Sequence, residues 1–306
     1  MTESVAEPPD GATKPRTREP LLAGVMSLVI PGLGQLYAGR ALRGAAVALG
    51  CIVFGVASLL LGVAIPVRAL RIATLVLLPV PRILAAADAV RVAGAASRPY
   101  VPRRYNRWYV YASVIVVAQV ATRFAKELML AHVAHAWHIP TSVMEPTLLP
   151  GDYIMTSPRP FTVRRGDLVA YGDGSGEAFI QRVVAVPGDV VEMRGKALWI
   201  DGRPVTEPYA RHAGPASAPP DSLMEWQRDY LIRPSTADYT PTRDDWGPLR
   251  VPAGQYLMLG DNRDESLDGR WRGFVPREAI TARVVWIYFS YGENGVRWER
   301  IGAAVR

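Results

Sequence analysis

The stretch Ala197-Leu-Trp-Ile-Asp-Gly-Arg-Pro-Val205 decides the fold class of the C-terminal half of this 306-residue chain. Asp201-Gly202 separates two short runs, and an Asp-Gly pair there favours a hairpin turn because both central residues need positive φ. From His138 onward, short runs rich in Val, Ile, Tyr and Trp alternate with Gly, Pro and Asp. This pattern predicts antiparallel all-β structure. Strands are expected near 152–155, 167–170, 179–186, 190–193, 197–200, 256–259 and 283–289.

The chain before this domain is far more apolar. Its apolar stretches lie at 21–38, 44–66, 69–88 and 108–123. Pro31 and Gly34 interrupt the first stretch, which we expect to dip into the membrane without crossing it. The other three are predicted to cross, which makes the chain an integral membrane protein.

Charge favours the same interpretation. The net charge is +7, and nearly all of the positive charge is arginine. An arginine-rich segment at 98–107 precedes the last apolar stretch, where cytoplasmic flanks of membrane helices carry such charge, so membrane topology is favoured over a nucleic-acid surface. The single cysteine, Cys51, can form no intrachain disulfide.

These patterns predict a domain organisation. It comprises a disordered cytoplasmic tail over 1–19, a membrane module over 20–95, a basic cytoplasmic linker over 96–107, a transmembrane anchor over 108–130, and a β domain over 131–306 with a turn-rich insertion near 207–250. With the linker inside the cell, the β domain lies outside.

Three boxes stand out in the β domain: IPTSVMEPTLLPGDYI at 139–154, QRVVAVPGDVVE at 181–192 and MLGDNRDESLDGRWRGFVP at 258–276. In order and spacing they resemble signal peptidase I, of the S26 serine peptidase family. In addition PGLGQLYAG at 31–39, with Arg43 and Asp88 further along, resembles a small membrane module of several bacterial proteins. The resemblance implies a signal-peptidase-like barrel or sandwich after the membrane helices.

Peptide hydrolysis by such a site needs a hydroxyl nucleophile, a base and an oxyanion donor. In the family the base is a lysine kept neutral by burial. Aligning Met144 on the first box puts Val143 at the nucleophile position, and valine has no lone pair or proton to give. Aligning Arg182 on the second box puts Gln181 at the base position, and an amide accepts no proton at relevant pH. The resemblance therefore implies that both halves of the catalytic dyad are lost.

No other residue is expected to replace the dyad. Ser142 precedes the nucleophile position, and on an extended segment it would point to the opposite face. Lys196 follows Gly195 and is predicted to be a solvated turn residue. The histidines all lie outside position 181: His132, His135, His138 and His212.

The rest of the boxes is predicted to be retained. Thr141 stands where the family supplies a hydroxyl to the oxyanion hole. The turn at 260–264 is expected to brace the domain. The supporting residues of the third box are Ser266, Asp268 and Arg270, with Gly269 in place of a family serine, and the predicted substrate contacts are Pro140, Met144 and Ile180.

The functional hypothesis is a pseudoenzyme of the protein-export pathway that binds signal peptides or export partners without cleavage. We expect it in the bacterial cytoplasmic (inner) membrane, with its C-terminal domain on the extracytoplasmic side. Its expected partners are signal peptides or preproteins, the export machinery and the lipid bilayer, with no nucleic acid, cofactor or metal.

Two alternatives stay open. One is an active signal peptidase I that processes signal peptides after Ala-x-Ala in protein secretion, with Ser142 or Ser266 as a displaced nucleophile. The other is a membrane scaffold or assembly component in which the N-terminal module matters most.

Overall fold

The computed structural model describes residues 18–96, 100, 103–158, 160–172, 177–214, 218–232 and 239–305. By its contacts the chain divides into two compact units. The first, residues 1–64 with 73–127, is called the helical unit, and the second, 65–72 with 128–306, is called the β unit. Of the tail predicted over 1–19, residues 1–17 lie outside the described residues.

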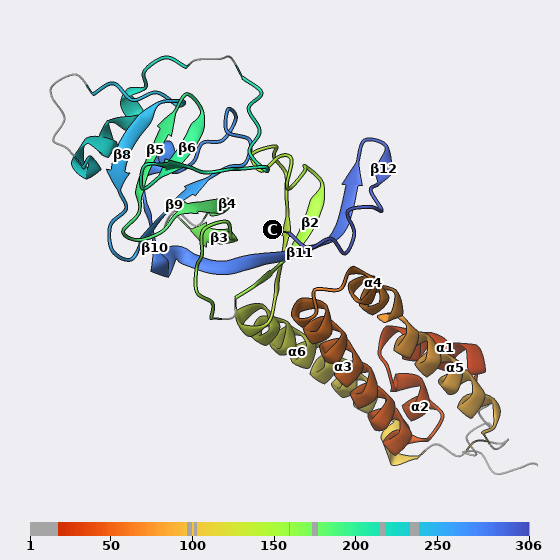
Figure 1. Ribbon diagram of the computed structural model, residues 1–306. Coiled ribbons are helices and arrows are strands. Elements are labelled where there is room, and N and C mark those ends of the chain that lie inside the picture. Colours follow the sequence, from red (N-terminus) through yellow and green to blue (C-terminus); the bar gives the residue numbers. More distant parts are fainter. Residues whose placement is uncertain are drawn as a thin grey trace, which may run out of the picture. The chain divides into compact units, whose positions relative to one another are not determined.

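The N-terminal part of the chain is helical (Figure 1). Its helices are α1 (Pro20–Val29), α2 (Leu33–Tyr37), α3 (Ala41–Ala64), α4 (Arg68–Leu77), α5 (Val80–Gly94), the 3-10 helix η1 (Arg104–Asn106) and α6 (Trp108–His132). The helical stretches long and apolar enough to cross a membrane are Ala41–Ala64, Arg68–Gly94 and Trp108–Leu130. They coincide with the three predicted crossings, whereas α1 has only 10 residues.

Small residues let α1, α2 and α5 pack closely. Ala23, Ala89 and Ala93 are buried together. A Cβ added to Gly34 would overlap the backbone of Ala23, so only glycine allows this approach.

A polar cluster lies inside this packing. Gln35 is fully buried, and its Oε1 accepts a 2.6 Å hydrogen bond from Ser27 Oγ. Its Nε2 donates to Ala85 O at 2.9 Å and to Asp88 Oδ2 at 3.1 Å. Asp88 also accepts a 2.5 Å bond from Arg43. The residues that carry the resemblance to the membrane module therefore meet in one hydrogen-bonded cluster.

The β unit is antiparallel. Its strands are β1 (His135–His138), β2 (Asp152–Ser157), β3 (Leu168–Gly172), β4 (Ala178–Ala185), β5 (Val190–Arg194), β6 (Ala197–Ile200), β7 (Arg203–Pro204), β8 (Trp246–Arg250), β9 (Gln255–Leu259), β10 (Val275–Pro276), β11 (Ile280–Gly292) and β12 (Gly295–Val296). Short helices η2 (Ser222–Tyr230), α7 (Gly269–Arg272) and η3 (Arg277–Ala279) join some of them.

Two sheets form within the described residues. The larger has the order β1-β2-β11-β3-β4-β9-β10, with β12 paired to β11, and the smaller has the order β7-β6-β5-β8. No pairing between the described residues joins β1 to β10, so the larger sheet stays open. The predicted class, membrane-type helices followed by an antiparallel β domain, is confirmed.

The hairpin in the opening stretch forms as predicted. β6 pairs with β7, and Asp201 and Gly202 take φ values of 51° and 74°. The sequence pattern did not predict β8, which lies at the end of the turn-rich 207–250 stretch and pairs with β5.

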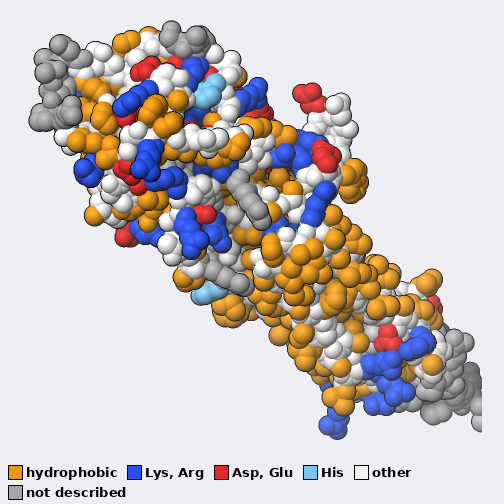
Figure 2. All heavy atoms as spheres, in the orientation of Figure 1, with side chains coloured by type: hydrophobic (Ala, Val, Ile, Leu, Met, Phe, Trp, Pro, Cys, Tyr) orange, Lys and Arg blue, Asp and Glu red, His pale blue; other side chains and the backbone are white. Residues whose placement is uncertain are grey.

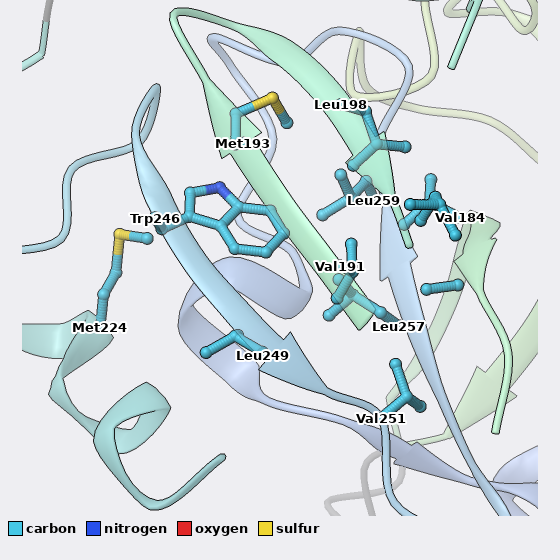
Figure 3. Close-up of a cluster of buried hydrophobic side chains, with 12 residues drawn as sticks. Val184, Val191, Met193, Leu198, Met224, Trp246, Leu249, Val251, Leu257 and Leu259 are labelled. Atoms are coloured by element: carbon cyan, nitrogen blue, oxygen red, sulfur yellow. The ribbon is translucent and has the colours of Figure 1, made fainter. Parts of the chain in front are cut away.

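Apolar side chains between the smaller sheet, β9 and η2 form the largest core cluster (Figure 3). Trp246 and Leu249 from β8 meet Leu257 and Leu259 from β9, with Met224 of η2 beside them. A second cluster, which includes Ile139, Met144, Leu148 and Ile154, lies under the first sequence box. This packing holds β9, and therefore the box that follows it, in place.

Candidate active site

Strand pairing brings the second and third boxes together. β4 carries Gln181 and Arg182, and Arg182 lies opposite Leu259 at the end of β9. The third box turns away immediately after Leu259, so its loop begins beside the base position.

A buried ion pair joins all three boxes. Arg182 donates to both carboxylate oxygens of Asp261, at 2.8 and 2.7 Å, and neither side chain is more than 1% exposed. Thr147 of the first box donates a 2.5 Å bond to the same carboxylate. The ring of Tyr209 lies 3.8 Å from the Arg182 guanidinium, and burial, with nearby Glu207, raises the pKa of the Tyr209 hydroxyl far above its usual value. The three boxes are thus fixed by one charged network under a neutral phenol.

The third box is braced from within, as predicted for the 260–264 turn. Asp268 accepts a 3.0 Å bond from the Gly260 N–H and pairs with Arg270 at 2.9 and 2.8 Å. Arg263 donates to Gly260 O at 3.0 Å and forms two bonds with Glu207. Asp268 and Arg270 therefore shape the loop and are buried away from solvent.

Val143 sits in a turn held by this loop. Its carbonyl accepts from the Asn262 N–H at 3.1 Å, and a Cβ added to Gly260 would lie 2.7 Å from that carbonyl. The Val143 side chain packs partly buried on the cluster around Met144. At the nucleophile position the chain therefore offers an apolar side chain.

The expectation for Ser142 rested on an extended backbone, and that premise is wrong. The Glu145 N–H donates to Ser142 O at 2.9 Å, which closes a turn. The Ser142 hydroxyl donates to Glu265 Oε2 at 3.2 Å, and Asn262 Nδ2 donates to the same oxygen at 2.9 Å. Ser142 thus pairs with a carboxylate that sequence reasoning missed.

Gln181 is buried and only 2% exposed. Its Oε1 accepts a 2.6 Å bond from the hydroxyl of Tyr171. Its Nε2 lies 3.5 Å from both Ser266 Oγ and Leu267 O, longer contacts that still give both amide ends a partner. The predicted base position therefore holds the neutral amide of Gln181, and the groups around it suit both the oxygen and the nitrogen of that amide.

Tyr171 was also missed from the sequence. It lies on β3, two residues after Val169, which pairs directly with Gln181. Since alternate residues of a strand share a face, its diagonal position beside Gln181 follows once the β3–β4 register is known.

The predicted substrate contacts differ in accessibility. Pro140 is exposed and Ile180 is partly buried, and Thr141, the predicted oxyanion donor, is exposed next to Pro140. Met144 is buried in the core, which leaves little of its side chain for a ligand to contact. Ser266 is buried beside Gln181.

Lys196 is not the solvated turn residue that was predicted. Its Nζ lies 3.2 Å from both carboxylate oxygens of Asp264, and its side chain is 15% exposed. Burial works to raise the pKa of Asp264, but the Gly214 N–H and Lys196 outweigh it, so that pKa is lowered. Burial, with Arg263 nearby, lowers the pKa of His212, which stays neutral at pH 7. Lys196 is therefore held in an ion pair with Asp264.

Among the residues that the structure describes, no group of three or more His, Cys, Asp or Glu side chains is placed to hold a metal ion.

An antiparallel β domain that follows an apolar helix is the arrangement that the sequence resemblance implied, and the structure adds that the three boxes meet at one buried ion pair. The sequence pattern described as "Signal peptidase, peptidase S26" matches residues 107–289, more than half of the chain. The chain belongs to the S26 signal peptidase family.

Individual relatives agree with this. A signal peptidase I of Leptolyngbya laminosa is 32% identical over 178 residues, which cover 53% of this chain and 74% of that protein. A signal peptidase I of Bacillus licheniformis is 27% identical over 196 residues, which cover 61% and 92%. A crystal structure of a signal peptidase I from Enterococcus faecalis matches 40% of this chain and 97% of that chain, with 28% identity and a TM-score of 0.27.

Proposed function

We propose that the protein is a membrane-bound signal peptidase homologue that binds signal peptides without hydrolysing them. The observation that carries the proposal is the buried amide of Gln181 at the base position, bonded to Tyr171 on one side and facing Ser266 on the other. An amide cannot take the proton of a hydroxyl nucleophile, and the nucleophile position holds Val143.

The expected consequence for turnover is large. Removing the nucleophile of a well-studied serine protease lowers turnover by about 10⁶, and loss of a second member adds little because the groups act as a unit. Residual stabilisation by oxyanion donors amounts to roughly 10³ to 10⁴ over water, too little for useful processing. Thr141, proposed as such a donor, cannot compensate for the missing dyad.

Peptide binding has separate support. Relatives that cover much of this chain are named signal peptidase I, so a preprotein is the ligand class that we propose. Leu267 is 55% exposed, and its carbonyl lies at the Gln181 amide. An exposed apolar side chain beside the base position suits the apolar residues of a signal peptide.

A binding measurement tests this. Full-length protein in detergent is titrated with a fluorescent signal peptide that ends in Ala-x-Ala, and with the same peptide carrying two charges in its apolar segment. We expect saturable binding of the first peptide only, weakened about tenfold by Leu267→Glu through lost apolar contact. Leu223→Glu, at a residue 69% exposed on η2, is the matched control and should bind as wild type. Equal binding of both peptides would contradict the proposal, and absence of binding would favour a scaffold role.

We further propose the cytoplasmic membrane as the location, with the β unit on its extracytoplasmic side. The three apolar helices and the arginines before α6 support this. A Cys51→Ser, Glu293→Cys variant, whose new thiol lies in the β11–β12 turn, should react with an impermeant maleimide in intact cells. Labelling only after cell lysis would contradict the orientation.

A second candidate is peptidase activity with Ser142 as nucleophile and Glu265 as base. The 3.2 Å hydrogen bond between them favours it, because a carboxylate is able to accept a proton. Asn262 Nδ2 donates to the same carboxylate oxygen at 2.9 Å, so Ser142 shares its acceptor with a second donor. Cleavage abolished by both Ser142→Ala and Glu265→Gln would establish this candidate.

A further inference from the structure

A cavity of about 600 Å³ opens at one end of the helical unit. Its lining residues are Arg18, Tyr37, Asn106, Arg107, Trp108, Tyr109 and Tyr111. This volume suits a small-molecule headgroup. Two of the lining side chains are cationic and none of them is acidic.

Arg18 is the best-placed cation in this cavity. Its guanidinium lies 4.2 Å from the ring centre of Tyr37 and 4.1 Å from that of Tyr100. Stacking on two rings fixes the plane of the guanidinium. Its Nε is buried and has no hydrogen-bond partner among the described residues. Because Arg18 also lines the cavity, its fixed guanidinium is suited to donate to an anionic oxygen there.

The remaining polar lining is held by internal bonds. Asn106 Nδ2 donates to Tyr111 Oη at 2.8 Å and to Leu36 O at 3.1 Å, while its Oδ1 accepts from Tyr100 at 2.6 Å. Arg107 donates to Tyr109 Oη at 3.1 Å. Much of the cavity wall is therefore preorganised, which lowers the cost of binding.

The place of the cavity along the chain points to a lipid. It lies at the start of α6, where the candidate span Trp108–Leu130 begins. Trp108 and Tyr109 are exposed there, and Trp and Tyr gather at membrane–water boundaries. In Figure 2, Lys and Arg side chains gather at one end of the helical unit, next to a band of hydrophobic side chains. The cavity thus lies at the predicted headgroup level.

We infer that this cavity binds the phosphate-bearing headgroup of an anionic phospholipid, with Arg18 and Arg107 as the phosphate ligands. The aromatic side chains beside the two arginines then contact the part of the acyl chains next to the headgroup. This inference rests on the membrane crossing of α6 and not on peptide binding. The lipid site can therefore be refuted while the proposed peptide binding stands, and the reverse.

The test compares lipid affinities of the purified full-length protein in detergent, by native mass spectrometry with phosphatidylglycerol and phosphatidylcholine. We expect wild type to prefer phosphatidylglycerol. The double variant Arg18→Gln, Arg107→Gln should lower that preference at least about tenfold, because each arginine supplies one charge contact with the anionic headgroup. Arg103→Gln with Arg104→Gln removes the same charge from exposed residues that do not line the cavity, and should retain most of the preference.

A single variant and a competition with inorganic phosphate test the lipid site further. Arg107→Gln alone retains the Arg18 stack, so it should fold and show an intermediate loss. Equal losses in the two double variants, or no preference in wild type, would overturn the inference. So would displacement of the lipid by millimolar inorganic phosphate, because the cavity would then be a site for free anions.

Discussion

The hydroxyl of Tyr171 on β3 donates a 2.6 Å hydrogen bond to Oε1 of Gln181 on β4, and each of the two residues is only 2% exposed. A phenol hydroxyl and an amide thus satisfy each other at the position predicted to be that of the base. A lysine in place of Gln181 would remove the carbonyl oxygen to which the Tyr171 hydroxyl donates. The site is built around the amide.

This pairing predicts a specific pattern of stability. Tyr171→Phe leaves Oε1 of Gln181 unsatisfied and should lower the free energy of unfolding by about 1 to 3 kcal/mol. Adding Gln181→Leu removes both partners, so the double variant should be less destabilised than the sum of the single ones. Denaturant unfolding of the full-length protein in detergent measures this cycle. Tyr291→Phe, at a residue 55% exposed, is the control, and strict additivity would refute the pairing.

The ion pair between Arg182 and Asp261 should dominate the stability of the β unit. Arg182→Met strands a buried carboxylate and is expected to cost about 3 to 5 kcal/mol in unfolding free energy. Arg165→Met, which breaks the more exposed Arg165–Asp189 pair, should cost no more than about 1 kcal/mol. Similar losses in the two variants, measured by thermal unfolding, would show that the boxes are held together in another way.

Acid should weaken the β unit partly through Asp264. The lowered pKa of this carboxyl means that its stabilisation is present above the unfolded value, about 3.9, and is lost as pH falls through the folded value. Asp264→Asn should therefore lower stability at pH 7 and flatten the loss of stability below pH 4. Glu293→Gln, in an exposed turn, is the control. An unchanged acid limb in Asp264→Asn would contradict this assignment.

Restoring the dyad should restore some chemistry. Val143→Ser with Gln181→Lys is expected to give detectable cleavage of a preprotein, while each single variant stays inactive because the two groups act as a unit. The double variant should also melt at a lower temperature, because the lysine must be buried in its neutral form. A folded double variant without any cleavage would mean that the surrounding residues have diverged too.

Local chemistry explains what the sequence predicted well. Asp201-Gly202 sets a turn through its own backbone preferences, and the alternation of apolar residues marks most strands without reference to the rest of the chain. The assignment of Val143 and Gln181 to the nucleophile and base positions rests on the order of the boxes and stays a prediction. Neither inference requires knowledge of contacts distant in sequence.

Contacts distant in sequence explain what was missed. β8 lies about 50 residues from its partner β5 and contains Gly247 and Pro248, which read as turn residues. Lys196 looked solvated because its partner Asp264 is 68 residues away. Ser142 was misjudged because the turn at 142–145 breaks the alternation expected of an extended segment.

The most direct test of the central claim is cleavage by the unaltered protein. Full-length protein in liposomes is incubated at tenfold excess over a preprotein with an Ala-x-Ala site, and the amount of mature product is followed by mass spectrometry. We predict bound, intact preprotein and no product above the protein-free control. Mature product that disappears with Ser142→Ala or with Ser266→Ala would contradict the account.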